Sequence, residues 1–75
     1  MGDIRKQIID GMIAHNKGKI AKHKANVEIY LNQSVGIGEH GDVLETIEKE
    51  LNAMGKCHEQ LEMINMYFAD KTPKI

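Results

Sequence analysis

Four histidines and one cysteine are the residues of this sequence best suited to chemistry. Neutral imidazole and thiolate are the usual ligands of zinc, and a thiol next to an imidazole base is a potential nucleophile. Cys57 and His58 are adjacent in sequence, however, so on a helix their side chains point about 100° apart. His15, His23 and His40 lie elsewhere along the chain, and no three ligands converge. The sequence therefore predicts no metal site and no catalytic thiol, and we expect the protein not to be an enzyme.

A second chemical pattern lies in the stretch Val35 to Gly41, where Gly36-Ile37-Gly38-Glu39-His40-Gly41 spells G-x-G-x-x-G. Such glycines cradle a dinucleotide pyrophosphate only where a strand meets a helix inside a βαβ unit. No strand precedes this stretch, only 34 residues follow it, and Glu39 would place a negative charge beside a phosphate. We therefore expect no nucleotide and no other cofactor. The glycines are predicted to supply the positive φ values of an elbow that reverses the chain between two helices.

The first predicted helix covers residues 3 to about 31 and contains no proline. Its apolar residues recur at spacings of three and four or their sums, which is helix periodicity; they are Ile9, Ile13, Ile20, Val27 and Tyr30. The segment His15 to Lys19 resembles a helix C-cap with Gly18 in the left-handed region, which would divide this helix in two. Because the apolar phase continues from Ile13 to Ile20, one long helix is favoured.

The second predicted helix covers residues 42 to about 70. Its heptad positions form an unbroken seam, with Leu44, Leu51, His58 and Asn65 at a and Ile47, Met54, Leu61 and Phe68 at d. Asp42 followed by Glu45 resembles a capping box, and Pro73 should stop the helix by Thr72. A fold-back about residue 37 sets Asn16 opposite His58, either as a buried contact that fixes the helix register or as polar groups at the wet edge of the seam.

These elements define one all-α domain, residues 1–75, with a first helix at 3–31, an elbow at 32–41, a second helix at 42–70 and a tail at 71–75. A chain of 75 residues buries too little surface for a large core of its own. We therefore predict an antiparallel, coiled-coil-like helical hairpin that completes a bundle by forming a homo-oligomer, most simply a dimer.

The single cysteine, the charged N-terminal residues and the lack of a long apolar stretch indicate a cytoplasmic setting. The single cysteine fits a reducing compartment, charged residues interrupt the N-terminus where a signal peptide needs an apolar run, and no stretch is long and apolar enough to span a membrane.

Residues 1–31 carry six basic and three acidic side chains and residues 39–70 carry two basic and eight acidic ones. The two helices should therefore attract each other.

A basic run in the first helix suggests a second function. It consists of Lys17, Lys19, Lys22 and Lys24. Such a lysine run is typical of phosphate contacts, and small dimeric hairpins that bind RNA exist, such as the plasmid copy-number regulator Rop. Alternatively, Lys17, Lys19 and Lys24 flank the seam and pair with glutamates of the second helix, namely Glu48, Glu50 and Glu62. The acidic second helix and the low aromatic content argue against nucleic acid, so an RNA-binding hairpin is the alternative prediction.

Small residues form a stripe on the first helix, opposite its apolar seam. The stripe consists of Gly11, Ala14, Gly18, Ala21 and Ala25, at spacings of three and four. Glycine inside a helix costs roughly 1 kcal/mol relative to alanine, so two on one line need a reason. Close approach of another helix is one reason and indifferent surface filler is the alternative; we predict that the stripe is an oligomer interface.

The segment from Val27 to Phe68 resembles small uncharacterised proteins of tailed bacteriophages, especially phages of marine bacteria and cyanobacteria. The resemblance depends mainly on Val35-Gly36-Ile37-Gly38-Glu39-His40, on Asp42 and on the heptads that follow. It implies expression inside an infected bacterium, with a location in the host cytoplasm or the virion and a host or virion protein as a possible partner. It supplies no activity and no functional residues. The sequence thus predicts a non-enzymatic interaction or structural module.

Overall fold

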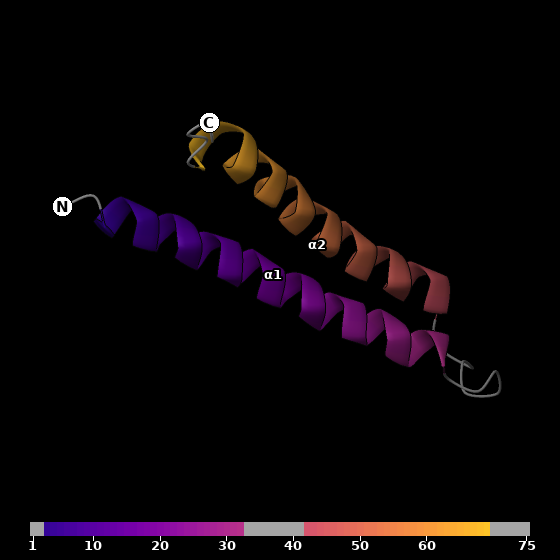
Figure 1. Ribbon diagram of the computed structural model, residues 1–75. Helices are drawn as coiled ribbons and strands as arrows, with labels where there is room; N and C mark the ends of the chain where they lie inside the picture. The colour runs from indigo at the N-terminus through magenta and orange to yellow at the C-terminus, as the bar shows by residue number, and fades with distance from the viewer. Residues whose placement is uncertain (1–2, 33–41, 70–75) are drawn as a thin grey trace, which may run out of the picture.

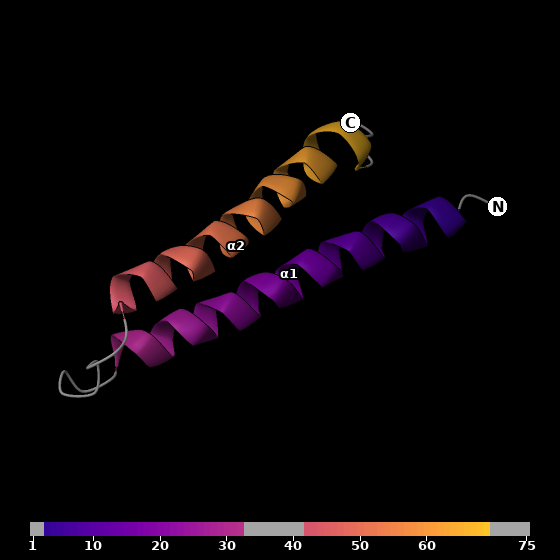
Figure 2. The ribbon, with the colours of Figure 1, turned by 180° about the vertical axis from the view of Figure 1, so that it is seen from behind.

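The computed structural model describes residues 3–32 and 42–69, which form an antiparallel pair of helices. Helix α1 (Asp3–Leu31) runs the length of the molecule, and α2 (Val43–Met63) returns beside it and continues into a short π-helical turn, η2 (Ile64–Phe68). Figure 1 shows the two helices side by side, and Figure 2 shows the same arrangement from behind. The molecule is a rod of 57 × 19 × 19 Å. The predicted helical hairpin is confirmed.

Helix α1 is continuous through Gly18, as the unbroken apolar phase predicted. Lysine and alanine neighbours favour helix, and the apolar face that Ile13 and Ile20 turn toward α2 continues on both sides of the glycine, which offsets its weak helix propensity. The helix closes at Asn32, whose backbone N–H donates to the Glu28 carbonyl at 3.1 Å. The Asn32 side chain donates to the same carbonyl at 2.7 Å.

Helix α2 begins at the cap that the sequence predicted. The Asp42 carboxylate accepts the backbone N–H of Glu45 at 2.9 Å, and the Thr46 hydroxyl donates to the Asp42 carbonyl at 3.1 Å. The first contact satisfies a backbone N–H that has no partner inside the first turn, and the Asp42 carbonyl also accepts the Thr46 backbone N–H at 3.0 Å. Asp42 therefore fixes where the second helix starts.

The end of the second helix differs from the prediction of a regular helix to about residue 70. The α-helix ends at Met63, and the chain widens into η2, where the Ala69 N–H donates to the Ile64 carbonyl at 2.8 Å. The Arg5 guanidinium of α1 donates to the Phe68 carbonyl at 2.8 Å. One side chain of α1 thus holds the last turn of the returning helix.

The face of α1 that contacts α2 is the predicted one, but α2 presents a different face from its predicted seam. The d positions Ile47, Met54 and Leu61 are partly buried, whereas Leu44 and Leu51 are 80% and 52% exposed. His58 and Asn65 are exposed as well. In their place, a column spaced by seven residues faces α1: Val43, Glu50, Cys57 and Ile64. The prediction that the heptad positions labelled a in α2 contact α1 was wrong. A single neighbouring helix covers only part of a wide apolar stripe, and Glu50 turns toward polar groups of α1.

The core between the helices is thin. Among the described residues only Asn16 and Cys57 are buried, at 1% and 3% exposure, and the other facing side chains are half-buried. Two helices touch along a single line, so side chains on either side of that line stay in contact with water. The hairpin by itself therefore buries few of its apolar side chains.

The predicted glycine elbow and its positive φ values at Gly36, Gly38 and Gly41 lie outside the described residues, as does the tail from residue 70. Within residues 3–32 and 42–69, no helix is both long and apolar enough to cross a membrane.

Candidate functional site: the two edges of the hairpin

A polar cluster lies in the contact between the helices. The Glu50 carboxylate of α2 is 2.6 Å from the His23 Nδ1 atom of α1 and accepts a hydrogen bond from the Asn26 side-chain amide at 3.1 Å. The side chains of His23 and Glu50 are 16% and 20% exposed. The three groups fix the register of the two helices near their loop end, the end where α1 finishes and α2 begins.

A hydrogen bond with His23, and to a lesser extent one from Asn26, holds the pKa of the Glu50 carboxyl below its usual value of 4.5. Because the pKa is lower in the folded chain, the carboxylate contributes stability that is present above the unfolded pKa and lost as pH falls through the folded pKa. We expect Glu50→Gln to lower the urea midpoint at pH 7 and to reduce the loss of stability on acidification toward pH 3. Urea titrations across this range measure both effects.

The matched control for this experiment is Glu59→Gln, which alters an exposed carboxylate of the same helix that makes no hydrogen bond in the described part of the chain. Its acid profile should match that of the unaltered protein. Equal acid slopes for Glu50→Gln and the unaltered protein would contradict a stabilising role for the Glu50 cluster.

Asn16 and Cys57 are the two buried side chains, one from each helix. The Asn16 amide donates to the Met12 carbonyl of its own helix at 3.1 Å. His58, which the fold-back set opposite Asn16, is instead 71% exposed and lies 3.9 Å from the Glu62 carboxylate. The contact between Asn16 and His58 is therefore absent, because α2 turns Cys57 rather than His58 toward α1.

Cys57 and the three described histidines, His15, His23 and His58, do not gather at one place within residues 3–32 and 42–69. Cys57 is buried while its neighbour His58 points into solvent, as their adjacency on a helix predicted. Within the described residues, no three side chains of the His, Cys, Asp and Glu types are grouped so as to hold a metal ion. His40 lies outside the described residues.

One long edge of the hairpin carries lysines from both helices, and we call it the lysine edge. Lys19 of α1 meets Lys49 and Lys56 of α2 around a hollow of about 310 Å³. The hollow is also lined by His23, Asn52, Ala53, Cys57 and Gln60. The basic run of α1 does not gather there, since Lys17 and Lys24 lie seven residues apart on the opposite edge of α1. All four predicted lysines are exposed, but Lys19 lies on the lysine edge while Lys17 and Lys24 lie on the other edge.

The predicted pairs between lysines of α1 and glutamates of α2 do not form within residues 3–32 and 42–69. Glu50 accepts from His23 and Asn26 instead, Glu62 lies near His58, and Glu48 is exposed with no ion pair. The ion pairs of a heptad edge require both helices to present the predicted faces. Because α2 turns Glu50 and Cys57 toward α1 instead of its predicted face, this requirement is not met.

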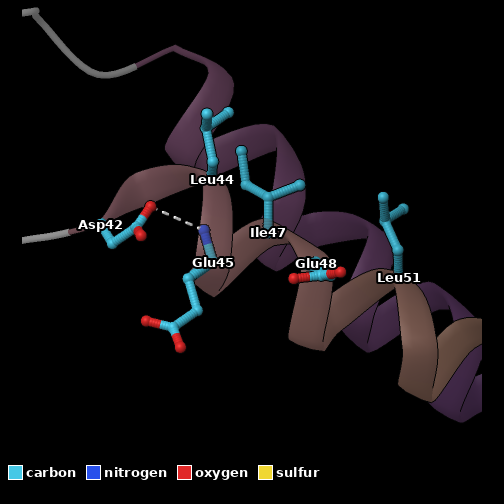
Figure 3. Close-up of a pocket in the computed structure, with 6 residues that line it drawn as sticks. All are labelled: Asp42, Leu44, Glu45, Ile47, Glu48 and Leu51. Atoms are coloured by element: carbon cyan, nitrogen blue, oxygen red, sulfur yellow. Dashed lines mark hydrogen bonds between the residues drawn. The ribbon is translucent and has the colours of Figure 1, made fainter.

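The other long edge is apolar near the loop end, and we call it the leucine edge. It comprises Leu44, Ile47 and Leu51 of α2, and we include Leu31 of α1 because it lies seven residues beyond Lys24 on the same side of that helix. Figure 3 shows the three α2 side chains projecting from one side of the helix beside Glu48, with the Asp42 cap at its start. They line a shallow hollow of about 590 Å³ together with Asp42, Glu45 and Glu48. Leu31, Leu44 and Leu51 are 63%, 80% and 52% exposed.

The small-residue stripe of α1 is fully exposed along its length. A Cβ atom at Gly11 or Gly18 would meet nothing within 4 Å, so the space beside these glycines is open. Within one chain, the stripe therefore makes no close helix contact.

Sequence reasoning missed three features of these surfaces. The lysine edge gains Lys49 and Lys56 from the acidic helix, the polar cluster includes Asn26 and Glu50, and Cys57 rather than His58 faces α1. The spacing of seven residues between Val43, Glu50, Cys57 and Ile64 was a visible signal that Cys57 lies on the face of α2 that contacts α1. Its polar and small members made this column look weaker than the leucine column beside it.

No known protein family, curated protein or solved structure matches this chain.

Proposed function

We propose that this protein is a non-enzymatic helical module that acts by self-association and by binding other proteins through its helical surfaces. The observation that carries the proposal is the number of large apolar side chains left in water by the hairpin. Within residues 3–32 and 42–69, eleven are exposed: Ile4, Ile8, Met12, Ile29, Leu31, Leu44, Leu51, Met63, Met66, Tyr67 and Phe68. Leu44 and Leu51 lie together on the leucine edge, and apolar side chains gathered on one face are typical of surfaces that bind a partner.

Other parts of the proposal come from the sequence. The resemblance to phage proteins favours a phage-encoded protein that works in the cytoplasm of an infected bacterium or in the virion. The stripe from Gly11 to Ala25 is proposed as a further close-packed surface, because the space beside its glycines is open to a neighbouring helix.

The test of self-association is the mass of the protein in solution. We expect sedimentation equilibrium to show a dimer, and thermal melts followed by circular dichroism to shift upward over a hundredfold rise in concentration, because association stabilises the folded state by mass action. A monomer whose melting temperature is independent of concentration would overturn the proposal.

The same preparation tests the RNA-binding alternative. The division of Lys17, Lys19 and Lys24 between two edges weakens this alternative, because the basic groups do not line one groove. We expect the purified protein to have an absorbance ratio typical of protein alone. Bound nucleic acid that is released at high salt would favour the alternative instead.

A further inference from the structure

We propose that a second copy of this chain docks on the leucine edge with the loop ends of both hairpins together, so that α1 of each copy lies along α2 of the other. This inference rests on the proposed self-association and specifies its surface and geometry. The two-fold axis then runs parallel to the helices, and four helices form the bundle.

The leucine edge offers a second copy apolar side chains that the single hairpin leaves exposed. Leu44 and Leu51 belong to the apolar stripe of α2 and are left outside the contact with α1. The hydrogen bonds of Glu50 to His23 and Asn26 set the helix register, which places Leu31 level with Leu44. A two-fold axis parallel to the helices keeps every residue at its level. Leu44 of each copy therefore meets Leu31 of the other, and both leave water.

Charge on the two edges favours the same docking surface. On the leucine edge, Lys17 and Lys24 of α1 are exposed, as is Glu48 of α2, and none of the three forms an ion pair within the described residues. Lys24 lies level with Leu51, within one turn of Glu48. The proposed dimer sets Lys24 of each copy against Glu48 of the other. Docking on the lysine edge would instead bring Lys19, Lys49 and Lys56 of two copies together, and like charges oppose such an interface.

The net charges of the helices select between the two possible two-fold arrangements. Residues 3–31 carry six basic and three acidic side chains, and residues 42–68 carry two basic and six acidic ones. If the loop ends pointed in opposite directions, α1 would lie on α1 and α2 on α2, which places like charges together. With the loop ends together, each basic helix lies on an acidic one. Opposite potentials at an interface fix the relative orientation of the partners.

Small side chains permit the helices to approach in the middle of this edge. Ala14 and Ala21 of α1 lie on the same side as Lys17 and Lys24, and Gly55 of α2 is one helical turn beyond Leu51. All three are exposed, and a Cβ atom at Gly55 would meet nothing within 4 Å. The half of the small-residue stripe that includes Ala14 and Ala21 thus faces the second copy.

Distances between spin labels on the two copies test the geometry. Glu45, Asn52 and Glu59 are exposed and lie seven residues apart on one line of α2, so single cysteines at these sites in a Cys57→Ser background share one lateral position. With the loop ends together, the distance between labels should be the same, within a few ångströms, at all three sites. With opposite orientations, the axial separation changes by about 21 Å for each step of seven residues, and no centre makes all three distances equal.

Unequal distances along the line would overturn the proposed geometry and leave self-association intact. Absence of any dipolar coupling in all three labelled proteins, with a monomer mass, would overturn self-association itself. A charge exchange distinguishes the edges: Lys24→Glu should weaken dimerisation about tenfold, and adding Glu48→Lys to the same chain should restore most of the loss. A dimer insensitive to both changes would show that the leucine edge is not the interface.

Discussion

Replacing Leu44 and Leu51 together by glutamine is expected to weaken self-association by at least about a hundredfold, because the dimer contains each of the two positions twice. Burying a leucine side chain contributes about 1.5–3 kcal/mol, and glutamine forfeits much of it. Both side chains are already exposed in the single hairpin, at 80% and 52%, so the helical content of the dissociated chain should not change. Sedimentation velocity over a concentration series measures the dimerisation constant, and circular dichroism measures the helix.

The matched control is Ile29→Gln, which removes an apolar side chain that is 58% exposed in α1. Ile29 lies two residues before Leu31 and faces away from the leucine edge. Its replacement should leave the dimerisation constant within a factor of about two, because an isolated exposed side chain contributes little. Equal weakening by Ile29→Gln and by the double replacement would mean that general hydrophobicity, rather than the leucine edge, drives association.

Replacing Asn16 by aspartate is expected to lower the free energy of unfolding by about 3 kcal/mol at pH 7. Asn16 is the most buried side chain, at 1% exposure, and its amide donates to the Met12 carbonyl. Aspartate has nearly the same shape but carries an unpaired charge that this position would remove from water. Burial raises the pKa of the introduced carboxyl, so stability should be lost as pH rises above about 4 and regained on acidification. Urea titrations at pH 4 and pH 7 measure the difference.

Asn16→Leu separates the effect of the charge from the effect of losing the amide. The Met12 carbonyl also belongs to the backbone hydrogen-bond ladder of α1, so removal of the amide leaves no unsatisfied acceptor. Leucine at this position should match or exceed the stability of the unaltered protein, at both pH values. If Asn16→Leu and Asn16→Asp were equally unstable at pH 7, the side-chain hydrogen bond to Met12, and not the exclusion of charge, would dominate at this position.

Local features of the chain were predictable because their causes lie within a few residues. The continuity of α1 follows from strong helix formers on both sides of Gly18, and the start of α2 follows from the Asp42 side chain and the Glu45 backbone N–H that it accepts. The antiparallel hairpin follows from two periodic apolar segments joined by a short glycine-rich connection. The apolar face of α1 was also predictable, since Ile13, Ile20 and Val27 form its dominant apolar line.

The rotation of α2 about its own axis was decided only by the tertiary structure. The sequence offers two adjacent columns on α2, one through Leu44 and Leu51 and one through Glu50 and Cys57, and a hydrophobic pattern ranks the first above the second. In the hairpin, His23 and Asn26 of α1 provide partners for Glu50, and this polar contact turns the second column inward. These hydrogen bonds join side chains that are 24 and 27 residues apart in the sequence. The periodicity within one helix carries no information about which side chains of the other helix they will meet. The same rotation leaves the leucines on an open edge, where the next contact of this protein is expected.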